Sequence, residues 1–141
     1  MRKWLALLLR LCLGALFAWA GFLKLQDPAA FANDIANYRL LPSLAPWMAA
    51  ALPMVELVLG AAVIAAPLAW RRAAALSLAA IMGVFTVAVS QALLRGISID
   101  CGCFGSSASP VTALTVVRDV ALFAAAAAIL ALDGPREARA A

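Results

Sequence analysis

Residues 45–66 read APWMAAALPMVELVLGAAVIAA, an apolar run interrupted by a single charged residue, Glu56. Roughly 20 apolar residues are enough for a helix to cross the hydrocarbon core of a bilayer. Three similar runs flank this one, at residues 4–25, 72–94 and 112–132. The sequence therefore predicts an all-α fold, in which residues 1–141 form a single integral membrane domain built as a four-helix bundle.

The composition points to the same class of protein. Of the 141 residues, 67% are apolar and 13% are charged, whereas a soluble domain averages about 45–50% apolar and about 25% charged residues. The chain contains no histidine, which excludes imidazole-ligated haem, His-based zinc or copper sites and Ser/His or Cys/His nucleophile pairs within it. The net charge of +4 is scattered over loops and termini, which fits membrane topology and not nucleic-acid binding.

The distribution of Lys and Arg predicts the orientation in the membrane, because cytoplasmic loops carry more of these residues. One side holds six of them: Arg2, Lys3, Arg71, Arg72, Arg136 and Arg139. The other side holds four: Lys24, Arg39, Arg95 and Arg118. We therefore expect a multi-pass protein of the bacterial inner membrane with both termini cytoplasmic. The first apolar run could instead be a cleaved signal peptide, but it continues to Leu25, which favours a retained helix.

The first outer loop has helical signals of its own. Asp27-Pro28 combines an acidic N-cap with proline at the first helical position. Phe31, Ile35 and Tyr38 follow at helical spacing. We expect a short amphipathic helix lying on the outer membrane surface, with a plain ordered loop as the alternative.

Five polar side chains from four predicted spans lie at one depth, in the outer half of the bilayer: Lys24, Glu56, Gln91, Arg118 and Asp119. Ionisable groups are expensive inside a membrane, so their common depth predicts that they converge. Two interpretations remain open. The residues could form a network that only locks the bundle, or they could line a functional pocket.

The loop before the last span carries the run Asp100-Cys101-Gly102-Cys103-Phe104-Gly105. A disulfide between Cys101 and Cys103 would close a small strained ring, and strained disulfides are the readily reduced ones. Thiol–disulfide exchange is therefore the favoured interpretation, with a purely structural disulfide next. Metal binding by two thiolates is the weakest, because a closed site needs four ligands. Cys12 lies too far along its helix to help and is expected to be buried.

Oxidation of thiols needs an acceptor for two electrons. The candidates are a quinone in the bilayer or the disulfide of a thioredoxin-like partner outside the membrane. The chain has no GxGxxG motif for flavin or nicotinamide and no Cys-x-x-Cys-His haem-attachment motif.

Several motifs together resemble the methylamine-utilisation MauE family, within the wider DoxX-like group of small four-helix membrane proteins. The matching elements are Gly21-Phe22-Leu23-Lys24-Leu25 with Asp27-Pro28, Phe31 and Tyr38, Pro53 and Glu56, Arg95-Gly96, residues 100–105, and Arg118-Asp119. The resemblance implies a role in maturing or exporting a disulfide-rich subunit of a periplasmic methylamine dehydrogenase, beside a thioredoxin-like periplasmic protein. Related members are expected to serve other maturation pathways.

These arguments give a set of candidate site residues. Cys101 and Cys103 are the proposed exchanging pair, and Glu56 is the proposed proton acceptor. The candidate substrate- or partner-binding residues are Lys24, Tyr38, Gln91, Arg95, Asp100, Phe104, Arg118 and Asp119. Lys24 and Arg118 could stabilise a thiolate or an anionic ligand. No metal ligand is assigned, and self-association of the chain is left open.

Two rival functions remain. The chain could be a non-enzymatic membrane scaffold or chaperone that docks a client protein, with a structural loop disulfide. It could also be a binding protein for a small molecule such as a quinone or a thiol. Replacing both loop cysteines by serine separates the redox function from the scaffold, and a molecule bound among Glu56, Gln91 and Arg118, far from either sulfur, would favour the binding protein.

Overall fold

The computed structural model describes residues 1–99 and 110–134 of the chain, and these residues are helical apart from short connections. The helices are α1 (Arg2–Gln26), α2 (Pro28–Asn37), the 3-10 turn η1 (Pro42–Leu44), α3 (Ala45–Ala65), α4 (Leu68–Leu94) and α5 (Ala113–Leu132). Four of them are long and apolar enough to cross a membrane, as predicted. The third begins at Leu68, before the expected start, with Pro67 as its N-cap.

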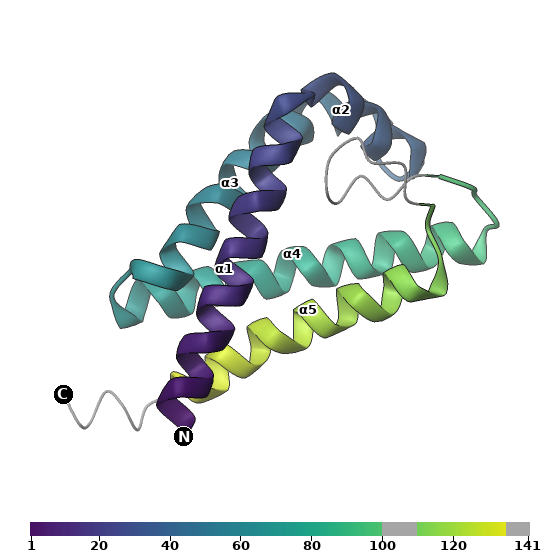
Figure 1. Cartoon of the computed structure of the whole chain (residues 1–141). Coiled ribbons are helices and arrows are strands. Elements are labelled where there is room, and N and C mark those ends of the chain that lie inside the picture. The colour runs from purple at the N-terminus through teal and green to yellow at the C-terminus, as the bar shows by residue number, and fades with distance from the viewer. Residues whose placement is uncertain (100–109, 135–141) are drawn as a thin grey trace.

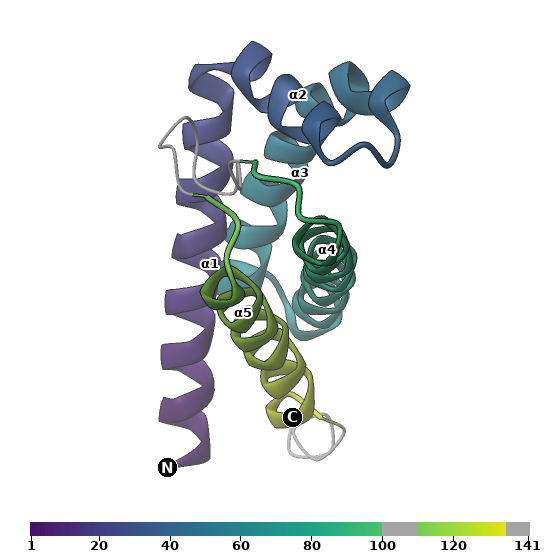
Figure 2. The ribbon, with the colours of Figure 1, turned by 90° about the vertical axis from the view of Figure 1, so that its right-hand side faces the viewer.

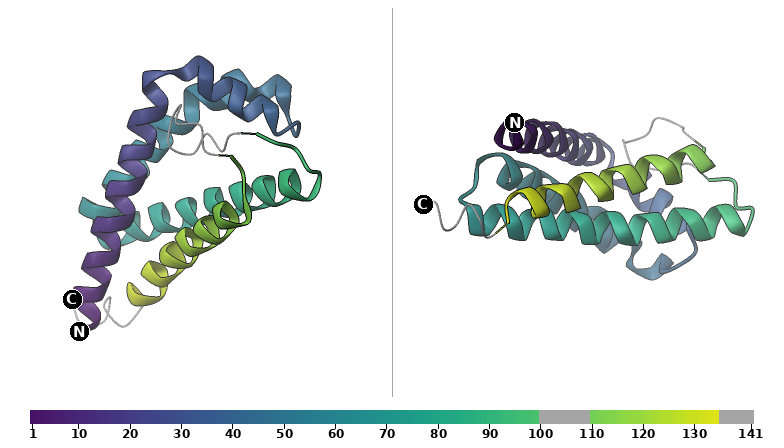
Figure 3. Two further views of the ribbon diagram at one scale, coloured as in Figure 1. Left: turned by 45° about the vertical axis from the view of Figure 1, so that its right-hand side comes forward. Right: turned by 90° about the horizontal axis from the view of Figure 1, so that it is seen from below.

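The helices pack as two pairs, α1 along α3 and α4 along α5. The pairs lie close together where α1 begins and α5 ends, and they diverge toward α2 (Figure 1). We call the first region the terminal end and the second the α2 end. α2 lies across the α2 end, beside the upper part of α3 (Figure 2). The left view of Figure 3 shows the same divergence, which leaves a wedge between the helix pairs.

Glycines allow α1 and α3 to approach closely. A Cβ atom added to Gly60 would lie 2.7 Å from the Gly14 carbonyl oxygen, and one added to Gly21 would lie 2.7 Å from the Pro53 carbonyl oxygen. No real Cβ atom tolerates such a contact with backbone. Small residues at helix interfaces are the usual means of close packing in lipid, where backbones gain van der Waals contact.

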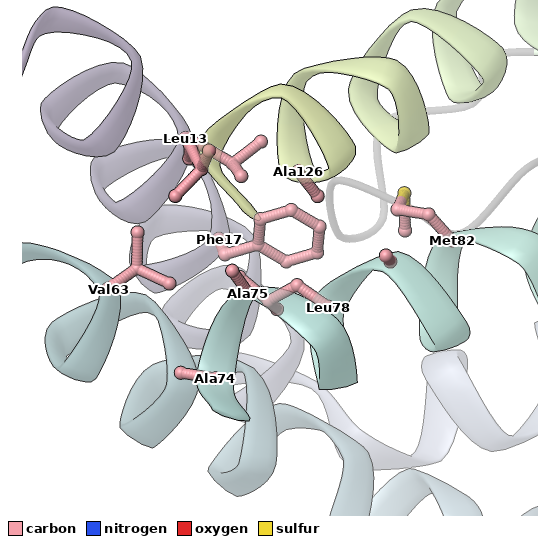
Figure 4. Close-up of a cluster of buried hydrophobic side chains, with 10 residues drawn as sticks. Leu13, Phe17, Val63, Ala74, Ala75, Leu78, Met82 and Ala126 are labelled. Carbon is pink, nitrogen blue, oxygen red and sulfur yellow. The ribbon is translucent and has the colours of Figure 1, made fainter. Parts of the chain in front are cut away.

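The apolar core lies toward the terminal end, where all four long helices meet. Phe17 of α1 projects among side chains of the other helices, with Leu78 and Ala126 beside its ring (Figure 4). Leu78, Val63 and Ile129 are fully buried. Outside this core the helix surfaces are also apolar. The spanning windows have a mean hydropathy of 2.0–2.1, yet only 17–33% of their residues are buried inside the protein, so most of their apolar side chains face outward. Such exposed apolar faces fit lipid contact.

The α2 helix confirms the prediction of a helix in the first loop and excludes a plain loop. The Asp27 carboxylate accepts a hydrogen bond from the Ala30 backbone N–H at 3.0 Å, and Pro28 occupies the first helical position. Phe31 and Tyr38 point inward and are buried. Its placement on a membrane surface stays a prediction.

The tryptophans lie on the outer surface of the helices. All four tryptophans, Trp4, Trp19, Trp47 and Trp70, are exposed. Trp4 and Trp70 lie near the beginnings of α1 and α4, at the terminal end, and Trp47 lies near the beginning of α3, at the opposite end. This distribution fits the aromatic belts at the two faces of a bilayer. Cys12 is also exposed on α1, so the expectation that it is buried was wrong.

Candidate functional site

A buried ion pair joins α1 to α3 at the α2 end. Lys24 Nζ donates to Glu56 Oε1 at 2.7 Å and to Oε2 at 2.8 Å. Both residues are almost fully buried, with exposed fractions of 2% and 1%. Lys24 lies in the last turn of α1, and Glu56 follows the helix-interior Pro53 by three residues. Each charge compensates the other, because a buried charge needs a partner of opposite sign.

Two phenylalanines flank the Lys24 ammonium. Its Nζ lies 5.0 Å from the ring centroid of Phe31 on α2 and 5.6 Å from that of Phe85 on α4. Cation–π contacts of this kind stabilise a desolvated ammonium by about 2 kcal/mol. Phe85 was not expected as a neighbour of Lys24. The only feature of the sequence that pointed to Phe85 is that an aromatic residue lies on the third span at the predicted depth of the charged groups.

A second ion pair lies on α5. Arg118 Nη2 donates to Asp119 Oδ1 at 2.9 Å, and Arg118 Nε lies 3.2 Å from the same oxygen. The Asp119 residue is only 2% exposed. Its other oxygen, Oδ2, is buried and has no hydrogen-bond partner among residues 1–99 and 110–134. Buried acceptors without partners are rare in proteins, so Oδ2 calls for an explanation.

The two ion pairs line one pocket in the wedge between the helix pairs. Lys24, Glu56, Arg118 and Asp119 form its polar part. Its walls are apolar and come from three helices: Leu16, Phe17, Ala20, Met82, Phe85 and Leu122. The pocket is partly open, and the space in it that water-sized molecules can occupy is about 20 Å³. This is room for about one water molecule.

Gln91 was expected in this pocket but does not line it. Gln91 Nε2 donates to the Tyr38 carbonyl oxygen at 3.1 Å, and Arg95 Nη1 donates to Gln91 Oε1 at 3.0 Å. These contacts tie the end of α4 to the end of α2. α4 presents Gln91 to the α2 segment because the two helix pairs diverge.

Tyr38 packs in a small apolar cluster with Val89 and Ala92, next to Ile99 and Val111. Burial raises the pKa of its phenol from 10.0 to about 12, and the negative charge of Asp119 acts in the same direction. Desolvation disfavours the charged phenolate, which accounts for the direction of this change.

The proposed thiol pair lies outside the described residues. Asp100, Cys101, Cys103 and Phe104 all fall within residues 100–109, between the two described parts of the chain. The described residues on either side are close together, because the Val111 backbone N–H donates to the Ile99 carbonyl oxygen at 2.9 Å.

A separate polar cluster at the terminal end was missed by sequence reasoning. Asp133 is fully buried and accepts hydrogen bonds from Arg10 Nη2 and, at 2.8 Å, from Arg71 Nε. One carboxylate therefore joins α1, α4 and the end of α5.

No group of three or more His, Cys, Asp or Glu side chains able to hold a metal ion occurs within residues 1–99 and 110–134.

The fold and the site define a multi-pass membrane protein with a buried, charge-balanced pocket between two helix pairs. The family model of methylamine utilisation protein MauE matches residues 2–132, and the chain belongs to this family. The methylamine utilization protein MauE of Paracoccus denitrificans is 40% identical over 124 residues, which are 86% of this chain and 66% of that protein. The protein of the same name from Paracoccus versutus is 39% identical over 98 residues, which are 68% of this chain and 52% of that protein.

The chain thus spans less than two thirds of the length of these relatives. No solved structure matches it. The wider DoxX-like grouping stays a prediction.

Proposed function

We propose that this chain is an inner-membrane component of methylamine utilisation that exchanges disulfides with an exported client protein at its α2 end. The client is expected to resemble the disulfide-rich subunit of a methylamine dehydrogenase. A periplasmic thioredoxin-like protein is the expected partner. The proposal takes the link to methylamine utilisation from the names of the relatives, and the thiol chemistry from the cysteine pair and the polar pocket of this chain.

One observation carries the proposal: the cysteine-bearing loop is attached at the same end of the bundle as the buried charges. Ile99 and Val111, hydrogen-bonded to each other, both pack against the cluster that contains Tyr38. Cys101 follows Ile99 by only two residues in the sequence. Arg118 and Asp119 lie in the first turns of α5, which begins directly after Thr112. Chain connectivity therefore links the thiols and the charged pocket to one end of the molecule.

The proposed exchange balances without any bound cofactor. A client thiolate attacks one sulfur of the Cys101–Cys103 disulfide and releases the other as a thiolate, and a second client thiolate then resolves the mixed disulfide. The client gains a disulfide, while the loop pair takes up two electrons and the two client protons. The disulfide of the thioredoxin-like partner, or a quinone, then accepts two electrons and two protons and restores the loop disulfide.

The geometry refines the roles of the charged residues. Both carboxylate oxygens of Glu56 accept hydrogen bonds from Lys24, so Glu56 can accept a proton from a thiol only after this pair opens. The Arg118 side chain is more accessible, with 34% of its surface exposed. Arg118 is therefore the better placed cation for stabilising a thiolate.

The proposed orientation places the α2 end in the periplasm and both termini in the cytoplasm. Among the described residues, the exposed basic side chains of the terminal end are Arg2, Lys3 and Arg72. Those of the α2 end are Arg39 and Arg95, because Lys24 and Arg118 are held in ion pairs. The small excess of exposed cations at the terminal end supports the orientation.

The test replaces Cys101 and Cys103 by serine in a host that grows on methylamine, with Cys12→Ser as the matched control. We expect the loop variant to accumulate client with reduced thiols, measured by alkylation and gel shift, while Cys12→Ser behaves as wild type. Normal client disulfides together with an intact client complex would instead assign the chain a scaffold role. A reduction potential of the loop pair near −200 mV or above supports exchange, and one below about −300 mV indicates a structural disulfide.

A further inference from the structure

We propose that the wedge pocket binds a small uncharged molecule from the bilayer, which donates a hydrogen bond from an O–H or N–H group to Asp119 Oδ2. The inference goes beyond the proposed thiol exchange and does not depend on the loop cysteines. It rests on an unpartnered acceptor, a balanced set of charges and apolar walls.

The acceptor sets the chemistry of the ligand head group. Asp119 is 2% exposed and lines the pocket, and its Oδ1 is already bound by Arg118. Its Oδ2 is buried, and no described residue donates a hydrogen bond to it. A carboxylate held by an arginine accepts hydrogen bonds and donates none. Leaving such a buried oxygen unpaired is unfavourable. A ligand that donates to Oδ2 removes this penalty.

The charges set the net charge of the ligand. The pocket contains two cations, Lys24 and Arg118, and two anions, Glu56 and Asp119. Each cation is hydrogen-bonded to one of the anions. A charged ligand would add an uncompensated charge to a buried site, which is strongly unfavourable. The ligand is therefore neutral.

The walls of the pocket indicate the polarity of the rest of the ligand and the environment from which it comes. The six other lining residues are apolar, and the two helix pairs diverge at this end of the molecule (Figure 3). The free space of about 20 Å³ admits only a small donor group, so the apolar body of the ligand would lie against the apolar lining where the pocket opens. Apolar molecules of this kind concentrate in the bilayer, which is therefore the expected source of the ligand.

The experiment compares two probes that differ in one hydrogen-bond donor. Radiolabelled para-octylphenol and its methyl ether, para-octylanisole, are titrated into the full chain in nanodiscs, with empty nanodiscs as the reference for partitioning. We expect saturable binding of the phenol, roughly tenfold tighter than that of the ether, because a hydrogen bond to a charged acceptor is lost in the ether. Equal affinities would show that the phenol donates no hydrogen bond to Oδ2, and no saturable binding beyond partitioning would show that neither probe binds. Either result would overturn the proposal.

The variant Asp119→Asn tests the acceptor itself. Its amide oxygen remains the best partner for the Arg118 guanidinium, so the amide N–H₂ group then points into the pocket. We expect the preference for the phenol to disappear or reverse. The matched control is Asp27→Asn, which removes a carboxylate outside the pocket and keeps a good N-cap for α2. An unchanged preference in Asp119→Asn would refute the assignment of Oδ2.

Independence from the thiol exchange is tested in the same assay. The variant with Cys101 and Cys103 replaced by serine should retain the phenol preference. Loss of this preference in the serine variant would tie the pocket to the thiols and contradict the proposed independence of the two sites. Retained binding alongside normal client oxidation would overturn the thiol function alone.

Discussion

Lys24 on α1 and Glu56 on α3 are joined by two hydrogen bonds, of 2.7 and 2.8 Å, at a point where both side chains are shielded from the surface. The two residues are 32 positions apart in the sequence. The pair therefore fixes the register of α1 against α3 at the α2 end. Its members depend on each other, since either one alone would leave an uncompensated buried charge.

The first prediction concerns this dependence. Lys24→Met should lower the free energy of unfolding by about 3–5 kcal/mol, because it leaves the buried Glu56 carboxylate without its charged partner. The double variant Lys24→Met with Glu56→Met should be more stable than the single variant, since it removes both charges. The measurement is a double-mutant cycle of unfolding in detergent micelles. Additive effects of the two substitutions would show that the pair contributes no coupling energy.

The four spans could be predicted well from the sequence because their length is a local property of each apolar run. Lys24, Glu56, Arg118 and Asp119 could also be placed at one depth, since turns of helix can be counted from the end of each span. The structure brings these four residues to one pocket. Their functional roles stay predictions.

The failures have a common physical cause. In a membrane protein both the inward and the lipid-facing sides of a helix are apolar, so the sequence pattern says little about helix rotation. Cys12 was therefore expected to be buried although it is exposed. Gln91 contacts the α2 segment and does not line the pocket, because the helix pairs diverge, and this divergence has no local signal in the sequence. Asp133 was missed because it follows α5 directly and looked like an ordinary loop residue.

The second prediction uses Tyr38, the only tyrosine of the chain. Tyrosinate absorbance should show a midpoint near pH 12 in the folded protein and near the ordinary value of 10.0 after unfolding. The folded state holds the phenol proton more tightly. The resulting stability, on the order of 2 kcal/mol, is fully present below the unfolded pKa and is lost as the pH rises through the folded pKa.

The negative charge of Asp119 contributes to this raised pKa. The Asp119→Asn variant should therefore titrate at a lower pH than the wild type. Asp27→Asn, which changes a carboxylate that does not contribute to the shift, should leave the midpoint unchanged. A wild-type midpoint near 10.0 would contradict the burial of Tyr38.

The third prediction concerns the close contact of α1 and α3. Gly60→Ala should lower the free energy of unfolding by about 1–3 kcal/mol, because the new Cβ would lie 2.7 Å from the Gly14 carbonyl oxygen and must push the helices apart. Gly83→Ala is the matched control, since its Cβ would meet only Phe123 at 3.8 Å. The control should be neutral or slightly stabilising, as alanine is the better helix former. Equal effects of both substitutions would argue against the close contact of α1 and α3.

The fourth prediction separates two neighbouring arginines at the terminal end. Arg71 donates to the fully buried carboxylate of Asp133, whereas Arg72 is exposed. Arg71→Ala should lower the free energy of unfolding by about 2 kcal/mol, because it removes a hydrogen bond between charged groups and leaves Arg10 as the remaining partner of Asp133. Arg72→Ala should change it by less than about 0.5 kcal/mol, as is usual for an exposed site. Thermal unfolding of both variants in the same detergent provides the comparison. Equal stabilities would mean that the Asp133 cluster does not hold α4 to α5, and that the apolar core around Phe17 alone closes the terminal end.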